Sequence, residues 1–379
     1  MSRSTFGSNS LSPSQLEKAL EMLPASLAVM IWGPPGIGKS TVVRRWATRD
    51  GMEFIRLPLA SMEAADLIGL PTFQDGFTSF AEPRRLWELT TEAEERRRAE
   101  EPEARTKAVL FLDELPQAGQ QVLHALSALI LDRTLGFGGL KLADGVRIVA
   151  AGNRLEDGAF ANPLGTHLRS RMIDVQLSAS LDDWRDYARQ TGMAPEVVSF
   201  VSSNRRWFHL FHPDNGDGPF PCPRTWEFAS EVVKSFASSE QERKDLLGPL
   251  LEGTVGPGAA AEFMAFLEST HLCPTADSVV ADPLTAPTFE DRPDLALLVL
   301  ENLILACRDD WDRYLDGTLL YAERLSSELR AVLSLALLED EGPSGLKQAV
   351  LSSPQFPVLR QEIRRSGQVT ITFDRMIDA

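Results

Sequence analysis

The amino-acid sequence predicts an α/β fold in its first half and an all-helical second half. Five runs are predicted to be strands, and two of them, 27–32 and 108–112, are wholly apolar, as in strands buried on both faces of a parallel sheet. They occupy residues 27–32, 53–57, 108–112, 146–151 and 172–177. Helical stretches separate these runs, which is the pattern of right-handed βαβ units. From Leu181 onward, apolar residues recur at helical spacing only.

The helices of the first half follow from capping residues and apolar spacing. After a flexible tail, Ser12, Pro13 and Gln15 form a capping box that begins a helix, and this helix ends at Pro24. A second helix is expected over residues 41–49, and the stretch 92–105, dense in Glu and Arg, is expected to be a solvated helix face or loop. Between the third and fourth strands, one helix face is marked by Val122, Leu126, Leu129 and Ile130.

The second half is expected to hold helices joined by loops. Helices are predicted over residues 181–192, 195–211, 224–237, 241–251, 257–270 and 295–338. Pro, Gly and Asp predict a loop over 213–223, and the Pro-rich stretch 273–294 predicts a linker. Residues 369–373 alternate in polarity and predict an edge strand.

Length and charge narrow the class of protein. The chain has 379 residues, a length that suggests about two or three domains, and 43% of them are apolar, enough to form buried cores. Its formal net charge of −16 disfavours DNA or RNA as the main partner, because a surface that binds nucleic acid must carry positive charge to neutralise the phosphates. The longest apolar run, 295–306, is shorter than the roughly 20 residues that span a bilayer. The first residues show no signal-peptide pattern, and Cys222, Cys273 and Cys307 have no zinc or redox spacing. The sequence therefore predicts a cytoplasmic protein whose thiols are buried or unreactive.

The most specific motif directly follows the first predicted strand. Residues 33–40, Gly-Pro-Pro-Gly-Ile-Gly-Lys-Ser, match the Walker A pattern in full. Small residues let successive backbone N–H groups point at a phosphate, and the next helix presents its N-terminal dipole to the same anion. Lys39 is expected to reach the β- and γ-phosphates of ATP, and Ser40 to place its hydroxyl on Mg²⁺. The expected nucleotide-binding residues are Gly33, Pro34, Pro35, Gly36, Ile37, Gly38, Lys39, Ser40, Thr41 and Asp113.

An acidic pair follows the third predicted strand. Residues 109–114, Val-Leu-Phe-Leu-Asp-Glu, form a Walker B pattern. The buried strand delivers Asp113 to its carboxyl end, where it can hold Mg²⁺ through water. Glu114 can then polarise the attacking water as general base, which indicates a hydrolase rather than a small-molecule kinase. The sequence has no Asn-Lys-x-Asp motif, which disfavours GTP.

An amide ends the fourth predicted strand, in residues 149–154, Val-Ala-Ala-Gly-Asn-Arg. Asn153 can orient water near a γ-phosphate, although by itself an Asn in a strand-end turn is ordinary. The two Walker motifs favour the catalytic interpretation. The histidines show no metal-ligand spacing and are expected to be structural.

These motifs resemble those of the AAA+ ATPases, and within them the MoxR branch, over about residues 12 to 270. The family has a polar sensor 1 at the end of the fourth strand, which Asn153 matches. Its arginine finger precedes the fifth strand, where Leu-Arg-Ser-Arg-Met makes Arg171 the expected finger and Arg169 the alternative. Its sensor 2 arginine opens a lid helix, and Arg224 in Pro-Arg-Thr-Trp matches it. All three arginines could instead be surface ion-pair formers.

The MoxR resemblance also concerns the stretch after the second strand. Residues 66–71, Asp-Leu-Ile-Gly-Leu-Pro, and the Glu-Pro pair at 82–83 are similar to the place where that branch inserts pore or substrate elements. The resemblance divides the chain into a flexible tail (1–11), an AAA+ nucleotide-binding core (12–178), a helical lid (179–275) and an accessory, mostly helical C-terminal region (276–379). The expected architecture is thus a P-loop NTPase parallel sheet followed by helices.

The resemblance implies a ring, usually a hexamer, with ATP at each subunit interface and Arg171 donated in trans. MoxR-type ATPases commonly work with a von Willebrand factor A-domain protein, as chaperones that remodel or mature a client; the sequence does not identify the client. Two alternatives stay open. A nucleic-acid motor or loader of the AAA+ class is disfavoured by the acidic balance. A nucleotide-dependent switch without hydrolysis is disfavoured by Glu114 and Arg171.

Overall fold

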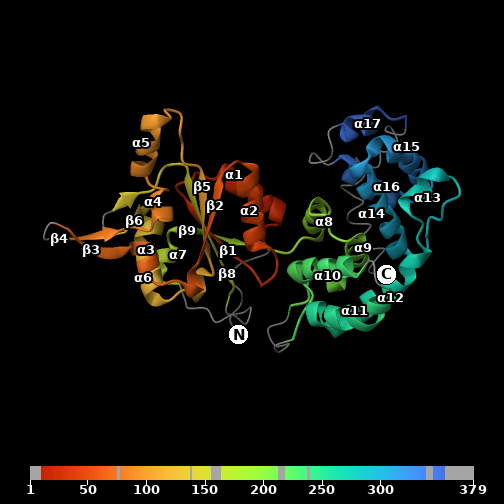
Figure 1. Cartoon of the computed structure of the whole chain (residues 1–379), viewed down its shortest axis with the longest axis horizontal. Helices are drawn as coiled ribbons and strands as arrows, with labels where there is room; N and C mark the ends of the chain where they lie inside the picture. The colour runs from red at the N-terminus through yellow and green to blue at the C-terminus, as the bar shows by residue number, and fades with distance from the viewer. Residues whose placement is uncertain are drawn as a thin grey trace. The chain divides into compact units, whose positions relative to one another are not determined.

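The computed structural model describes residues 10–74, 77–136, 139–154, 164–211, 218–236, 240–338 and 345–354. The chain forms two compact units, Met1–Ser180 with His212–Gly216, and Leu181–Phe211 with Asp217–Ala379. The first unit has an α/β architecture, and the described part of the second consists of helices and loops (Figure 1). None of the described helices is long and apolar enough to span a membrane.

A five-stranded parallel sheet forms the centre of the first unit. The strand order is β2-β5-β8-β1-β9, and each neighbouring pair runs parallel. In β5 every residue from Ala108 to Leu112 is buried, because helices cover both faces of the sheet. The five predicted strands and the α/β fold class are confirmed. The strands are β1 (Ala28–Trp32), β2 (Glu53–Pro58), β5 (Ala108–Asp113), β8 (Val146–Gly152) and β9 (Met172–Gln176).

Helices cover the two faces of this sheet (Figure 1). One face packs against α1 (Pro13–Met22) and α2 (Lys39–Arg49), and the other against α3 (Ala65–Ile68), α6 (Gln120–Leu131) and α7 (Thr166–Arg169). Successive strand residues alternate between the faces, so Met30 packs with α6 while Val29 and Ile31 pack with Trp46 of α2. The predicted face of α6 is confirmed, because all four of its marker residues are buried: Val122, Leu126, Leu129 and Ile130.

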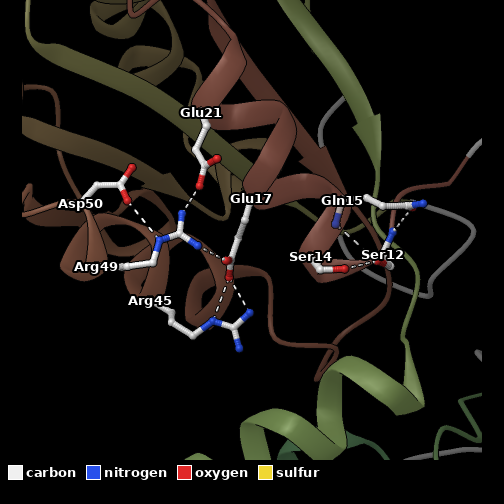
Figure 2. Close-up of polar contacts among 8 residues, drawn as sticks. All are labelled: Ser12, Ser14, Gln15, Glu17, Glu21, Arg45, Arg49 and Asp50. Atoms are coloured by element: carbon white, nitrogen blue, oxygen red, sulfur yellow. Dashed lines mark hydrogen bonds and ion pairs between the residues drawn. The ribbon is translucent and has the colours of Figure 1, made fainter. Parts of the chain in front are cut away.

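Figure 2 shows how α1 begins and how it is tied to α2. Ser12 Oγ accepts from the N–H of Gln15 at 3.4 Å, and Gln15 Oε1 accepts from the N–H of Ser12 at 3.0 Å, so the predicted capping box is confirmed. The buried Glu17 carboxylate accepts from Arg45 Nε at 2.8 Å and from Arg49 Nη1 at 3.1 Å. These ion pairs fix α1 against α2, the helix that follows the phosphate loop.

Two hairpins that the sequence did not predict are inserted into the first unit. The longer pairs β3 (Leu70–Gln74) with β4 (Phe77–Ala81), and the shorter pairs β6 (Thr134–Leu135) with β7 (Leu140–Lys141). The longer one starts after Gly69, whose φ is 91° and where a Cβ would lie 2.3 Å from Ala81 O, so glycine is required. After it come α4 (Arg84–Trp87) and α5 (Thr91–Glu100), the mostly exposed helix within the predicted Glu/Arg stretch.

Helices build the described part of the second unit. They are α8 (Leu181–Gln190), α9 (Pro195–Ser203), α10 (Pro223–Ser235), α11 (Glu240–Val255), α12 (Pro257–Ser269), α13 (Ala276–Ala281), α14 (Pro293–Asp309), α15 (Trp311–Ala322), α16 (Ser327–Leu338) and α17 (Leu346–Ser352). A buried ion pair joins α8 to α14: Arg189 Nε lies 3.0 Å from Glu301 Oε2, and Arg189 Nη2 lies 2.8 Å from Glu301 Oε1. Residues on both sides of position 275 therefore belong to one packed unit.

Three local predictions were wrong. The predicted linker 273–294 contains α13, which Thr275 caps by accepting from Ser278 N at 3.2 Å and which buries Val279. The helix predicted over 195–211 ends at Ser203, because Asn204 leaves helical geometry at φ −120° and ψ 63°. Leu11, assigned to the tail, donates its N–H to Gln176 O at 2.8 Å. The predicted edge strand 369–373 lies outside the described residues, as do residues 213–217 of the predicted loop 213–223 and residues 1–9 of the tail.

Candidate nucleotide-binding site

The Walker A loop joins the carboxyl end of β1 to α2, which begins at Lys39. Gly36 and Gly38 have φ values of 79° and 90°, in the region that favours glycine. A Cβ on Gly33 would lie 2.6 Å from Ile37 Cδ1 and 3.0 Å from Leu177 O. The motif's glycines are therefore required by the backbone itself, and the loop opens onto the N-terminus of a regular helix, where an anion is stabilised.

Lys39 connects this loop to the sensor strand. Its Nζ donates to Gly33 O at 2.7 Å, to Pro34 O at 3.0 Å and to Asn153 Oδ1 at 2.6 Å. An ammonium carries three N–H donors and no acceptor, so these three oxygens match its capacity. Two residues that are 114 positions apart in the sequence are thereby brought into direct contact.

The sheet order explains why the motif residues meet. Asp113 ends β5, Asn153 follows the end of β8, and the Walker A loop follows β1, and these are three adjacent strands. The carboxyl ends of parallel strands lie at one edge of a sheet, with neighbours about 4.8 Å apart. The structure therefore places the acidic residue, the amide and the loop along one edge, with the amide in the middle.

Asp113 is held through both carboxylate oxygens. Its Oδ2 accepts from Arg56 Nε at 2.7 Å, and its Oδ1 accepts from the N–H of Glu114 at 3.1 Å. The Asp113 side chain is 14% exposed, whereas that of Arg56 is 48% exposed. Sequence reasoning missed Arg56, because only the parallel pairing of β2 with β5, with Pro58 opposite Asp113, brings it to this carboxylate.

Glu114 has an unusual backbone. Its φ of 58° and ψ of 36° are left-handed, which is uncommon for a residue other than glycine, and its side chain is exposed. The next residues, Leu115 and Pro116, are buried. A Cβ on Gly152 would lie 2.4 Å from Pro116 Cδ, so the end of β8 packs tightly on the turn that carries Glu114.

Arg169 and Arg171 lie away from the loop of their own chain. Arg169 ends α7, Arg171 precedes β9, and both are exposed. The first residue of β9, Met172, pairs with Ala28, the first residue of β1, whereas the Walker A loop follows the last residue of β1. At about 3.3 Å per residue, the five residues of β1 separate the two ends of the strand by roughly 15 Å. The structure therefore places these arginines at the opposite edge of the sheet.

Arg224 belongs to the second unit. It is the second residue of α10, after Pro223 at the first helical position, and its side chain is exposed. Its predicted role as sensor 2 stays a prediction.

The residues at this edge fit a Mg²⁺–nucleotide complex. Ser40 and Asp113 offer a hydroxyl and a carboxylate, the hard oxygen donors that Mg²⁺ takes when it bridges to phosphates. The glycine-lined loop and Lys39 offer N–H donors and a positive charge to the phosphates themselves.

Comparison with known families agrees with this site. Residues 28–172 match the model of the AAA domain of the dynein-related subfamily, from the first residue of β1 to the first residue of β9. That segment is therefore similar to AAA domains, a class that in general hydrolyses nucleotides. The comparison with curated proteins found no match.

Solved structures of similar fold include two bacterial proteins. The RuvB Holliday junction branch migration motor of Thermotoga maritima is 16% identical, with 67% of this chain and 65% of that chain covered and a TM-score of 0.34. NtrX from Brucella abortus in complex with ATP is 16% identical, with 82% of this chain and 65% of that chain covered and a TM-score of 0.39. The chain thus spans slightly less than two thirds of the length of both, and likenesses this distant carry no functional argument.

Proposed function

We propose that this protein is an AAA+ ATP hydrolase that forms a ring and uses hydrolysis of the β–γ phosphoanhydride to remodel or mature a protein client, as MoxR-like chaperones do. The contact of Lys39 with Asn153 carries this proposal, since it joins the Walker A loop to the sensor amide at the sheet edge where Asp113 ends. A phosphate-binding loop without a catalytic role would not need an amide from a separate strand at its lysine.

Each side chain then has a role that its position supports. Lys39 pairs with the β- and γ-phosphates, while Ser40 and Asp113 hold Mg²⁺. Glu114, exposed beside Asp113, takes a proton from the attacking water, and Asn153 orients that water. These roles follow from the types of residue and from their shared edge of the sheet.

Two features support assembly and a protein client. Arg171 is exposed at the sheet edge remote from its own Lys39, which suits an arginine finger that acts on a neighbouring subunit. On the inserted hairpin, Phe73 and Phe77 are 83% and 77% exposed. Large exposed aromatic side chains of this kind favour a binding partner. The proposed ring is a hexamer in the cytoplasm, and a von Willebrand factor A-domain protein is the proposed accessory partner.

The test separates nucleotide binding from hydrolysis. Lys39→Ala should lose most affinity for a fluorescent ATP analogue, because phosphate charge is left unpaired. Glu114→Gln should keep that affinity and lose phosphate release, because only the proton acceptor is removed. The exposed residues Lys18 and Glu53 provide matched controls, and Lys18→Ala and Glu53→Gln should change neither measurement. Full turnover in Glu114→Gln would contradict the proposed function.

A further inference from the structure

The carboxylate proposed to hold Mg²⁺ is paired with a cation of its own chain. Arg56, on the neighbouring strand β2, donates through Nε to Asp113 Oδ2 at 2.7 Å. This pair is not part of the Walker motifs. Because a guanidinium stays protonated at every relevant pH, Arg56 places a permanent positive charge beside the group proposed to bind the metal.

The geometry of the pair makes it displaceable. The hydrogen bond joins Nε to one carboxylate oxygen, rather than forming the bidentate arrangement that makes Arg–carboxylate pairs strong. Arg56 is 48% exposed, so water can solvate its guanidinium once it leaves Asp113. Asp113 is 14% exposed, so its charge is less screened than that of a surface residue. The other oxygen, Oδ1, accepts from the N–H of Glu114 and stays oriented without Arg56.

We propose that Arg56 is a positioning residue that competes with Mg²⁺ for Asp113 and thereby sets the Mg²⁺ concentration at which the nucleotide complex forms. This inference rests on the proposed function, because it assumes that Asp113 holds Mg²⁺. Before the metal binds, Arg56 keeps the carboxylate in place and compensates its charge. Mg²⁺ held by the same carboxylate, through water as expected, and the guanidinium would repel each other, so binding of either cation would oppose binding of the other.

A structural and a competing Arg56 predict opposite changes in Mg²⁺ affinity when the residue is removed. A purely structural Arg56 would orient Asp113, and its loss would weaken Mg²⁺ binding. A competing Arg56 opposes Mg²⁺, and its loss strengthens Mg²⁺ binding. Exposed and half-exposed ion pairs contribute modestly, so the competition should amount to about three- to fivefold in Mg²⁺ affinity.

The experiment titrates Mg²⁺ at a fixed concentration of a fluorescent ADP analogue, with the full-length wild type, Arg56→Gln and Arg56→Lys. We expect the half-saturating Mg²⁺ concentration to fall about three- to fivefold in Arg56→Gln. In Arg56→Lys, which keeps the charge and loses the Nε donor, it should fall by a smaller factor. Affinity for the analogue in EDTA is measured in parallel. Thermal unfolding shows that each variant folds, and Arg56→Lys carries the test if Arg56→Gln does not.

A matched control is Arg84→Gln. Arg84 also donates through Nε to one carboxylate oxygen, Glu88 Oε1 at 3.0 Å, but on α4, outside the site. Its removal should leave the Mg²⁺ titration unchanged. An unchanged or raised half-saturating Mg²⁺ concentration in Arg56→Gln would overturn the competition. If the wild type binds no analogue with Mg²⁺ or in EDTA, the proposed function fails instead, so the two failures are distinguishable.

Discussion

The ammonium of Lys39 lies 2.6 Å from the amide oxygen of Asn153, and the same Nζ donates to two carbonyl oxygens of its own loop. The lysine therefore has acceptors within its own chain. A nucleotide must exchange these neutral acceptors for charged ones, which form stronger hydrogen bonds to an ammonium. Asn153 thus has one contact that the structure shows, with Lys39, and one proposed role, orienting water.

Substitutions at Asn153 separate these roles. Asn153→Ala should keep nucleotide affinity within about threefold and lower phosphate release at least about tenfold, because the water loses an orienting amide. Asn153→Asp should also weaken nucleotide affinity, since a carboxylate holds Lys39 more strongly and repels the phosphates. Fluorescent-nucleotide titration and phosphate release measure the two effects. Asn204→Ala, which removes an amide in the second unit, is the control. Equal nucleotide affinity in Asn153→Asp and the wild type would contradict the importance of the Lys39 contact.

The left-handed backbone of Glu114 predicts opposite effects on stability and activity. With φ at 58°, this residue holds a conformation that costs an L-residue about 1 kcal/mol and glycine almost nothing. Glu114→Gly should therefore raise the free energy of unfolding by up to about 1 kcal/mol while abolishing turnover. Glu114→Gln, which keeps the side-chain length, should abolish turnover without the gain. Urea unfolding with phosphate release decides, and a destabilised Glu114→Gly would show that the backbone is relaxed there.

The sheet and the residues at its edge were predictable, whereas Arg56 was not. Strands buried on both faces appear in the sequence as unbroken apolar runs, and Walker residues are fixed by spacing along the chain. The β3–β4 hairpin was missed although the pair Asp-Gly at 75–76, typical of two-residue hairpin turns, separates its strands in the sequence. Arg56 gains its importance from β2–β5 pairing across the sheet, which sequence spacing does not reveal.

The ion pair between α8 and α14 should contribute strongly to the stability of the second unit. Arg189 and Glu301 side chains are only 5% and 4% exposed, so removing one leaves the other charged and buried. Arg189→Ala should therefore cost about 3–5 kcal/mol of unfolding free energy. Replacing both residues, with Arg189→Met and Glu301→Leu, should recover most of it. Arg313→Ala breaks an exposed pair with Asp277 and should cost less than about 1 kcal/mol. Denaturant unfolding measures all three, and equal losses for the two alanine variants would contradict the argument.

The second unit should lose stability at alkaline pH. Burial raises the pKa of the Cys307 thiol to about 11 and that of the Tyr321 hydroxyl to about 12. Both groups keep their protons more firmly when folded, so this stability is full below the ordinary pKa, about 9 for Cys307 and 10 for Tyr321. It is lost as pH rises through about 11 for Cys307 and about 12 for Tyr321. At pH 10.5 the titration of Cys307 should have lowered the free energy of unfolding by about 1–2 kcal/mol. Cys307→Ala should therefore show a shallower loss of unfolding free energy between pH 8 and 10.5. Parallel losses in both proteins would show that Cys307 does not titrate in this way.

The position of Arg171 predicts how the proposed ring hydrolyses ATP. Met172, the next residue, pairs with the start of β1, whereas the Walker A loop follows its end. Arg171 and Lys39 of one chain therefore lie at opposite edges of the sheet, so Arg171 as the proposed finger would act on a neighbouring subunit. Fingers contribute about 10³–10⁵ in rate by stabilising charge on the γ-phosphoryl oxygens. Arg171→Ala should keep ATP binding and lose turnover, whereas full activity would assign the finger to Arg169 or another residue.

Mixed rings test whether the finger acts in trans. Arg171→Ala subunits have an intact Lys39, and Lys39→Ala subunits have an intact Arg171, so each inactive variant spoils a different half of a shared site. Mixing them should rebuild interfaces where an intact finger faces an intact loop. Phosphate release should rise above that of either variant alone and increase with protein concentration, because the site forms only on assembly. The control is a double variant that carries both Arg171→Ala and Lys39→Ala. When it is mixed with either single variant, no interface has both an intact finger and an intact loop, so the mixture should stay inactive. If the complementary mixture also stays inactive while labelled subunits are seen to exchange, Arg171 does not act across the interface.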